Sequence, residues 1–123
     1  MERDYAERRG DVLRELDGLR VEVDAEKKIG YLILERPPLN IVSYNERAQI
    51  RAIIEAFDED DDVGVVVIRG ADGIFSSGGD VKRFPKIPKN KMSDLADNIG
   101  APERCSKPVI AAIEKYALGV GFE

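Results

Sequence analysis

The apolar run from Val63 to Ile68 constrains the fold more than any other stretch of the sequence. It is almost continuously apolar and rich in β-branched residues, which is typical of a strand covered on both faces in a parallel sheet flanked by helices. A helix is predicted just before it, because Ser43 and Glu46 have the spacing of a capping box. Apolar residues then follow at helical intervals, namely Ile50, Ile53, Ile54 and Phe57. The sequence therefore predicts an α/β fold.

Two further strands are predicted upstream of that helix. Apolar and charged residues alternate over residues 19–24, and residues 29–34 form an apolar run. We expect these segments to pair as an antiparallel hairpin. The second strand must end at Pro37, because proline offers no N–H to the ladder. Residues 1–18 carry apolar residues at helical spacing among dense charges. They predict a short surface helix weakened by Gly10, and a frayed extension is the alternative.

The remaining segments are predicted from local composition. The five acids at residues 58–62 are expected to form a solvated turn, since they lack the alternation and the glycine of a calcium loop. Proline and lysine over residues 85–91 indicate a mobile surface connection. We expect a helix over residues 94–105, capped by Ser93 and interrupted near Gly100. Residues 109–113 are expected to form a short buried strand.

Composition limits the classes of function. The 123-residue chain suits one domain, and it has no apolar run near the roughly 18 residues that a membrane span needs. A net charge of -5 argues against a nucleic-acid backbone as the main partner. The single cysteine, Cys105, excludes an internal disulfide, and the absence of histidine excludes the usual zinc patterns. We expect a cytoplasmic protein with no metal site and no membrane partner.

A glycine-containing turn follows the apolar strand, within the motif Phe75-Ser-Ser-Gly-Gly-Asp-Val-Lys82. Adjacent glycines allow the backbone to approach a ligand closely. A helix starting at Asp80 would aim N–H groups at negative charge, either a phosphate or a carbonyl oxygen gaining charge in a transition state. Residues 108–123 repeat the pattern of apolar strand and glycine turn. Two such turns side by side could form an oxyanion hole, whereas an ordinary tight turn is the alternative for each alone.

These motifs resemble the crotonase (enoyl-CoA hydratase/isomerase) superfamily over nearly all of residues 19–123. The similar segments are residues 35–40, 65–70, 75–82, 107–113 and 117–123. The resemblance implies a partial crotonase-like ββα spiral, with residues 1–18 as a charged helical extension before it. It also implies that the chain is a fragment or a truncated gene product, because the C-terminal half of the fold is expected beyond residue 123.

The resemblance assigns roles to individual residues. The two oxyanion-hole N–H groups fall on Gly79 and Val120, and Glu123 falls on the first of two acids that hold and activate water. The implied CoA contacts are Ser77, Gly78, Asp80, Val81 and Lys82. The chain departs from the family at Val120, where members usually have glycine, and the branched side chain would narrow the pocket or move the turn.

The implied reaction is that of an enoyl-CoA hydratase, which adds water to an acyl-CoA while an oxyanion hole stabilises the thioester enolate. Hydrolases and isomerases of the same superfamily are neighbouring alternatives, because they share the oxyanion hole. A non-catalytic CoA-binding or interaction module is the alternative from another class. Coenzyme A would be part of the substrate, with no prosthetic group. The full-length protein is expected to form a homo-oligomer, a trimer or a hexamer.

Overall fold

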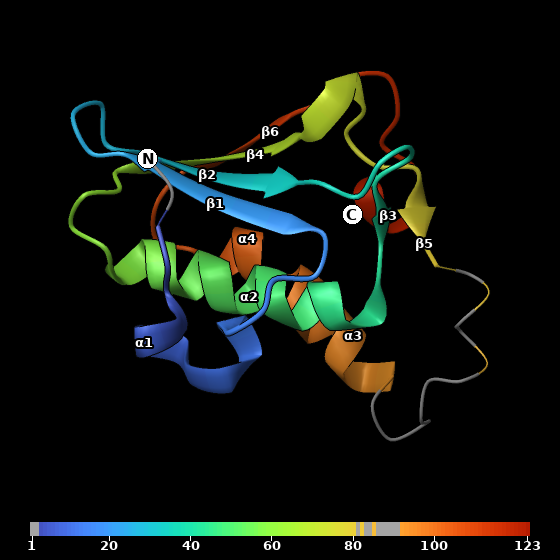
Figure 1. Cartoon of the computed structure of the whole chain (residues 1–123), viewed down its shortest axis with the longest axis horizontal. Coiled ribbons are helices and arrows are strands. Elements are labelled where there is room, and N and C mark those ends of the chain that lie inside the picture. The colour runs from blue at the N-terminus through green and yellow to red at the C-terminus, as the bar shows by residue number, and fades with distance from the viewer. Residues whose placement is uncertain (1–2, 81, 83–84, 86–91) are drawn as a thin grey trace.

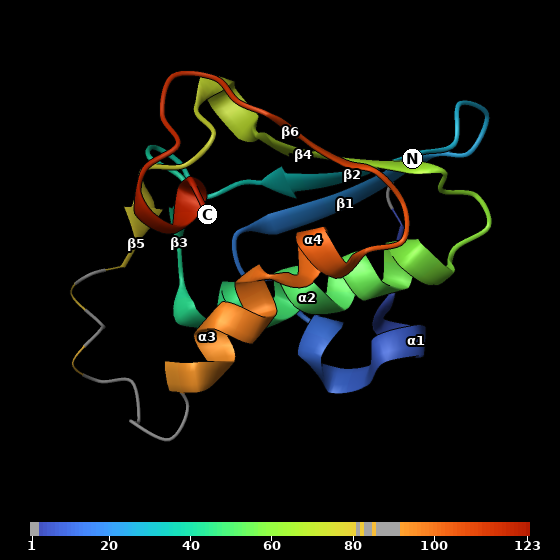
Figure 2. The same ribbon diagram turned by 180° about the vertical axis from the view of Figure 1, so that it is seen from behind.

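The computed structural model describes residues 3–80, 82, 85 and 92–123, and it contains a four-stranded sheet with helices packed against it (Figure 1). The spatial order of the strands is β1-β2-β4-β6. Their bounds are Leu19–Asp24 for β1, Ile29–Leu34 for β2, Val65–Gly70 for β4 and Val109–Ala112 for β6. The α-helices all lie on the same side of this sheet (Figures 1 and 2). The fold class is the predicted α/β class.

The strand pairings confirm the predicted hairpin and the predicted parallel sheet. β1 and β2 are antiparallel, whereas β4 runs parallel to β2 on one side and to β6 on the other. The expectation that this central strand is covered on both faces is wrong. Val66 is buried, but its neighbours Val65 and Val67 are only half-buried, because the helices cover one face of the sheet.

The long helix α2, Tyr44–Glu59, begins with the predicted capping box. The Glu46 N–H donates to Ser43 Oγ at 3.1 Å, and the Ser43 N–H donates to Glu46 Oε1 at 3.1 Å. These reciprocal bonds satisfy N–H groups that have no partner within the helix. Its apolar residues at positions 50, 53, 54 and 57 are all buried against the sheet.

The N-terminal segment forms two short helical turns, α1 (Ala6–Arg9) and η1 (Gly10–Leu13), in place of one surface helix. The helix breaks at Gly10, whose φ of 72° lies in the left-handed region. The segment is anchored by Tyr5, whose buried ring meets Phe57 edge-on at a centroid distance of 5.6 Å. The same segment is also hydrogen-bonded to the sheet, since the Arg3 N–H donates to the Val21 carbonyl of β1 at 3.1 Å.

The acidic run at residues 58–62, which begins in the last turn of α2, is not simply a solvated turn, and that prediction is wrong at Asp60. This carboxylate is buried, and it accepts hydrogen bonds from Tyr5 Oη at 2.7 Å and from Arg3 Nη1 at 2.8 Å. Lys107 Nζ donates to the Phe57 and Asp60 carbonyls at 2.6 and 2.7 Å. A cation at the C-terminal end of a helix offsets the unfavourable position of the acids there.

Two short helices follow the part of the chain that the structure leaves undescribed, which includes most of the predicted connection at residues 85–91. Helix α3, Met92–Ile99, begins before Ser93, so the predicted cap is wrong. The predicted interruption at Gly100 is confirmed, and α4, Ala101–Arg104, follows it. Within the described residues, no helix combines the length and apolar character that crossing a bilayer requires.

The last strand, β6, is present where predicted but is not buried. Ile110 keeps 53% of its surface exposed, and Ala111 and Ala112 are exposed as well. The physical reason is that β6 lies at the edge of the sheet, where β4 is its only strand partner among the described residues, and that the α-helices cover one face of the sheet (Figure 2). Apolar character alone did not reveal whether another segment covers this strand.

Candidate active site

The first glycine turn is fixed by a small second sheet. Its strands are β3, Ile41–Val42, and β5, Gly78–Gly79, which pair in parallel. The preceding residue adds another bond, since the Ser77 N–H donates to the Leu39 carbonyl at 3.1 Å. Gly78 has a φ of 114°, a conformation that side chains rarely allow. The sequence thus needs glycine here for backbone geometry.

The second glycine turn lies directly against the first, and both views place it beside β3 and β5 (Figures 1 and 2). It is the 3-10 turn η5, Gly119–Gly121. A Cβ on Gly78 would lie 3.2 Å from the Leu118 carbonyl oxygen, and one on Gly119 would lie 3.7 Å from Gly78 Cα. The structure therefore brings together the two turns on which the predicted oxyanion hole depends.

Backbone hydrogen bonds join the two turns just before each begins. The Ser76 N–H donates to the Tyr116 carbonyl at 2.9 Å, and the Leu118 N–H donates to the Ser76 carbonyl at 3.2 Å. One step earlier, the Phe75 N–H donates to the Glu114 carbonyl at 3.0 Å. This ladder fixes the register of the two segments, although 40 residues separate Ser76 from Tyr116 in the sequence.

The predicted catalytic residues lie on these two turns. Gly79, at the end of β5, and Val120, within η5, are both half-buried, and Glu123 is exposed. Val120 and Glu123 line a cavity of about 180 Å3 under the sheet. Its other lining residues are almost all apolar: Leu32, Leu34, Val42, Ile50, Ile68, Phe75, Ile99, Pro102, Val109, Ala111 and Gly121. Such a lining suits a hydrocarbon chain better than a polar ligand.

The predicted CoA contacts lie on the first turn and just after it. Gly78 is buried, Ser77 and Asp80 are half-buried, and Lys82 is exposed. Val81 lies outside the described residues, as does most of the helix predicted to begin at Asp80. Of the predicted CoA contacts that the structure describes, none lines the apolar cavity beside Glu123. The arrangement separates a polar backbone turn from an apolar hollow.

Arg47 of α2 was not predicted as part of the site, yet its charge interacts with Glu123. Burial lowers the pKa of the Arg47 guanidinium, and the Glu123 carboxylate acts in the opposite direction. A sequence signal existed, because Arg47 lies three residues before Ile50, on the apolar face of the helix. A charged residue on that face must find a polar environment inside the fold.

Two buried polar residues that support the turns were also missed. The Asn40 side chain accepts from the Arg36 N–H at 2.7 Å and donates to the Ile74 carbonyl at 2.7 Å. The Ser76 hydroxyl accepts from the Gly78 N–H at 3.2 Å. A serine bonded to the N–H two residues later is a common turn motif, so the Ser-x-Gly pattern was a usable signal.

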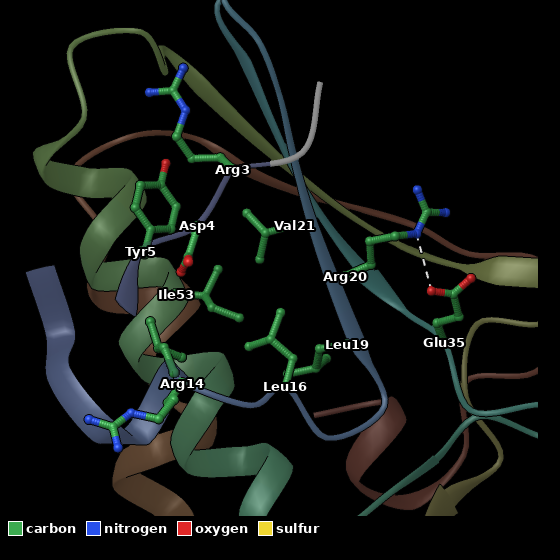
Figure 3. Close-up of a pocket in the computed structure, with 11 residues that line it drawn as sticks. Arg3, Asp4, Tyr5, Arg14, Leu16, Leu19, Arg20, Val21, Glu35 and Ile53 are labelled. Atoms are coloured by element: carbon green, nitrogen blue, oxygen red, sulfur yellow. Dashed lines mark hydrogen bonds and ion pairs between the residues drawn. The ribbon is translucent and has the colours of Figure 1, made fainter. Parts of the chain in front are cut away.

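A second hollow, of about 380 Å3, lies between the N-terminal segment, β1 and α2 (Figure 3). Side chains of Leu16, Leu19, Val21 and Ile53 point toward one another there. None of the predicted site residues that the structure describes lines it. Among the described residues, no group of three or more His, Cys, Asp or Glu side chains is placed to hold a metal ion.

Known proteins share both the sequence pattern and the fold. The protein named "Probable enoyl-CoA hydratase, mitochondrial" of Dictyostelium discoideum is 37% identical over 103 residues, which are 80% of this chain and 37% of that protein. The "Probable enoyl-CoA hydratase" of Rhizobium meliloti (strain 1021) is 34% identical over 107 residues, 82% of this chain and 40% of that protein. This chain therefore spans less than half the length of these curated relatives.

Solved structures agree with this likeness. The crystal structure of an enoyl-CoA hydratase/isomerase from Xanthobacter autotrophicus Py2 superposes with a TM-score of 0.77 at 25% identity, covering 87% of this chain and 42% of that one. Residues 24–123 match the family model described as enoyl-CoA hydratase/isomerase. Because this match extends over most of its length, the chain belongs to the enoyl-CoA hydratase/isomerase family.

Proposed function

We propose that this chain supplies the oxyanion hole and one acid of a crotonase-type enzyme, and that its reaction is the hydration of a 2-enoyl-CoA. The supporting observation is the direct contact between the two glycine turns. Addition of water across a double bond conjugated to a thioester places negative charge on the thioester oxygen. Two fixed N–H donors, those of Gly79 and Val120, would stabilise that charge by several kcal/mol.

Glu123 would act as the base in this reaction. Its carboxylate would orient a water molecule and accept its proton while the water oxygen bonds to C3 of the enoyl group. A proton returned to C2 then completes the addition. The base and the Val120 turn line the same apolar cavity, which could hold the hydrocarbon part of the acyl group.

Coenzyme A would lie along the first turn as part of the substrate, with no prosthetic group required. Ser77, Gly78, Asp80 and Val81 are the proposed contacts for its adenine end. Lys82 is exposed, so its ammonium group could reach a CoA phosphate. For the full-length protein we propose a homo-oligomer, a trimer or a hexamer, and a cytoplasmic location.

A non-catalytic CoA-binding module is the second candidate. The branched side chain of Val120 favours it, because this residue lines the cavity and would narrow the space beside the turn. Thioester hydrolysis and double-bond isomerisation remain the neighbouring reactions, because both also develop charge on the thioester oxygen.

Turnover of crotonyl-CoA separates these candidates. We expect Glu123→Gln to lower kcat by at least about 100-fold, the usual contribution of a general base. Binding of butyryl-CoA, which cannot be hydrated, should survive the substitution. Glu114→Gln, an exposed change in the same segment, is the matched control and should keep the parent rate.

The other outcomes each identify an alternative. Parent-level turnover in Glu123→Gln would remove this glutamate from the mechanism. Butyryl-CoA binding without any turnover of crotonyl-CoA would favour the non-catalytic module. Release of free CoA thiol from a saturated acyl-CoA would indicate a hydrolase.

A further inference from the structure

We propose that Ser76 is a positioning residue of this site, which sets the separation of the two turns that carry the Gly79 and Val120 amides. This inference rests on the proposed function, although its structural part can be tested without turnover. Ser76 has 0% of its surface exposed, so it cannot contact a substrate in this conformation. Any effect on catalysis must therefore pass through its neighbours.

The Ser76 side chain joins the first turn to the loop that precedes β3. Its hydroxyl donates to the Asn40 carbonyl at 2.9 Å and accepts from the Gly78 N–H at 3.2 Å. Gly78 immediately precedes Gly79, so this hydroxyl lies one residue from the first proposed oxyanion donor. A buried hydroxyl with both a donor and an acceptor role fixes its neighbours in one arrangement.

The Ser76 backbone joins the same residue to the second turn. Its N–H and carbonyl bond to Tyr116 and Leu118, which flank Ala117 in a short parallel bridge with Ser76. Both main-chain polar groups of this residue are thus used across the two segments. Displacing Ser76 would displace the start of the second turn as well.

Packing adds a third constraint, through Gly121. A Cβ on Gly121 would lie 2.7 Å from Ser76 Cβ and 2.9 Å from its Oγ. Real side chains do not approach so closely, so the second turn packs on Ser76 through a bare backbone. Gly121 immediately follows Val120, so each proposed donor is one residue from a direct neighbour of Ser76.

This arrangement predicts a specific kinetic defect. A displacement of about 1 Å in a catalytic group costs on the order of 100-fold in rate, whereas binding by remote parts of the substrate is unaffected. Ser76→Ala removes the hydroxyl and leaves the backbone bonds. We expect kcat for crotonyl-CoA to fall by at least about tenfold, with KM changing less than about threefold, because the donors act mainly in the transition state.

Two further variants test whether the hydroxyl is responsible. Ser76→Cys keeps a side chain of similar size with a weak donor, and it should recover part of the lost kcat. Ser106→Ala removes a surface hydroxyl that donates to Asp58, far from the turns, and should leave kcat unchanged. An unchanged kcat in a folded Ser76→Ala variant would overturn the proposal.

A second readout does not depend on activity. In 15N–1H spectra of the free chain, Ser76→Ala should move the amide resonances of Gly79 and also those of Val120 in the second turn, while Ser106→Ala should move neither. If the alanine variant does not fold by circular dichroism, Ser76→Cys takes its place. Unmoved Val120 resonances in a folded variant would refute the positioning role. A parent chain that fails to bind butyryl-CoA would instead refute the proposed function alone.

Discussion

The half of the molecule built around α2 and the segment from β6 to Glu123 are stabilised in different ways. Around α2, large side chains such as Phe57 and Ile53 are buried between the helix, the sheet and the N-terminal turns. In the C-terminal segment, the pairing of β6 with β4 and backbone hydrogen bonds to Phe75 and Ser76 hold the chain. Val109 and Val120 pack against the core, but the larger apolar side chains of the segment are exposed, namely Ile110, Ile113, Tyr116, Leu118 and Phe122.

This difference separates stability from site geometry. Burial of apolar side chains is the main favourable term in folding, so the α2 half should dominate the free energy of unfolding. The C-terminal segment carries Val120 and Glu123, and its geometry depends on its contact with the first turn. Substitutions in the two regions should therefore affect different measurements.

The largest contrast is expected between two phenylalanines. Phe57 is 0% exposed and packs edge-on against Tyr5, whereas Phe122 is 81% exposed. Phe57→Ala should lower the free energy of unfolding by about 3–5 kcal/mol, through lost burial and the cavity left behind. Phe122→Ala should change it by less than about 0.5 kcal/mol. Urea denaturation followed by circular dichroism measures both, and similar costs would contradict the comparison.

A pH-dependent effect of intermediate size is expected at Glu46, at the start of α2. Burial raises the pKa of this carboxyl from 4.5 to about 7, although Arg36 and the Ser43 N–H, which favour the ionised form, act against the shift. The neighbouring Asp17 carboxylate raises it further. The pKa of Glu46 is therefore higher in the folded protein than in the unfolded chain. The stability that this carboxyl contributes is fully present below pH 4.5 and is lost as pH rises through about 7.

Glu46→Gln removes this titration and tests its sign. Between pH 5 and pH 8 the parent should lose on the order of 1–3 kcal/mol more unfolding free energy than the variant. Glu55→Gln, on the exposed face of the same helix, is the control, and its free energy of unfolding should depend on pH as that of the parent does. The free energy of unfolding is measured by urea denaturation at each pH. If it changes with pH in the same way in the parent and in Glu46→Gln, the pKa of Glu46 is not raised in the folded protein.

The smallest effect is expected on the outer face of β6. Ile110→Thr keeps a β-branched residue in the strand and should change the free energy of unfolding by less than about 0.5 kcal/mol, because Ile110 is already exposed. Val66→Thr makes a similar change in the buried centre of β4 and should cost at least about 1 kcal/mol. Thermal unfolding of both variants provides the test, and a larger loss for Ile110→Thr would mean that β6 is covered in solution.

The sequence predicted the elements whose cause is local. The capping box at Ser43 and Glu46, the alternation of β1 and the β-branched run of β4 each determine their structure within a few residues. Burial was predicted less well, because it depends on distant partners. Asp60 is buried by Tyr5, 55 residues away, and the exposure of β6 depends on what lies beyond its edge.

For the site, the sequence identified the two turns but not what joins them. Their glycines indicated turns, and the resemblance to a family supplied the roles of Gly79, Val120 and Glu123. Ser76 was passed over, because its partners come from two other loops whose positions follow from the fold. The position of Arg47 on the apolar face of α2 was a signal in the sequence, but its interaction with Glu123 follows only from the fold.

The bond from the Arg3 N–H to Val21 has a consequence for how the sheet can grow. The start of the described chain already occupies part of the outer side of β1. Among the described residues, no strand pairs with the far side of β6, so a new strand could add to the sheet there. The two edges of the sheet are therefore not equivalent. A further strand, from the same polypeptide or from a partner, would add next to β6, the strand that leads into the second turn.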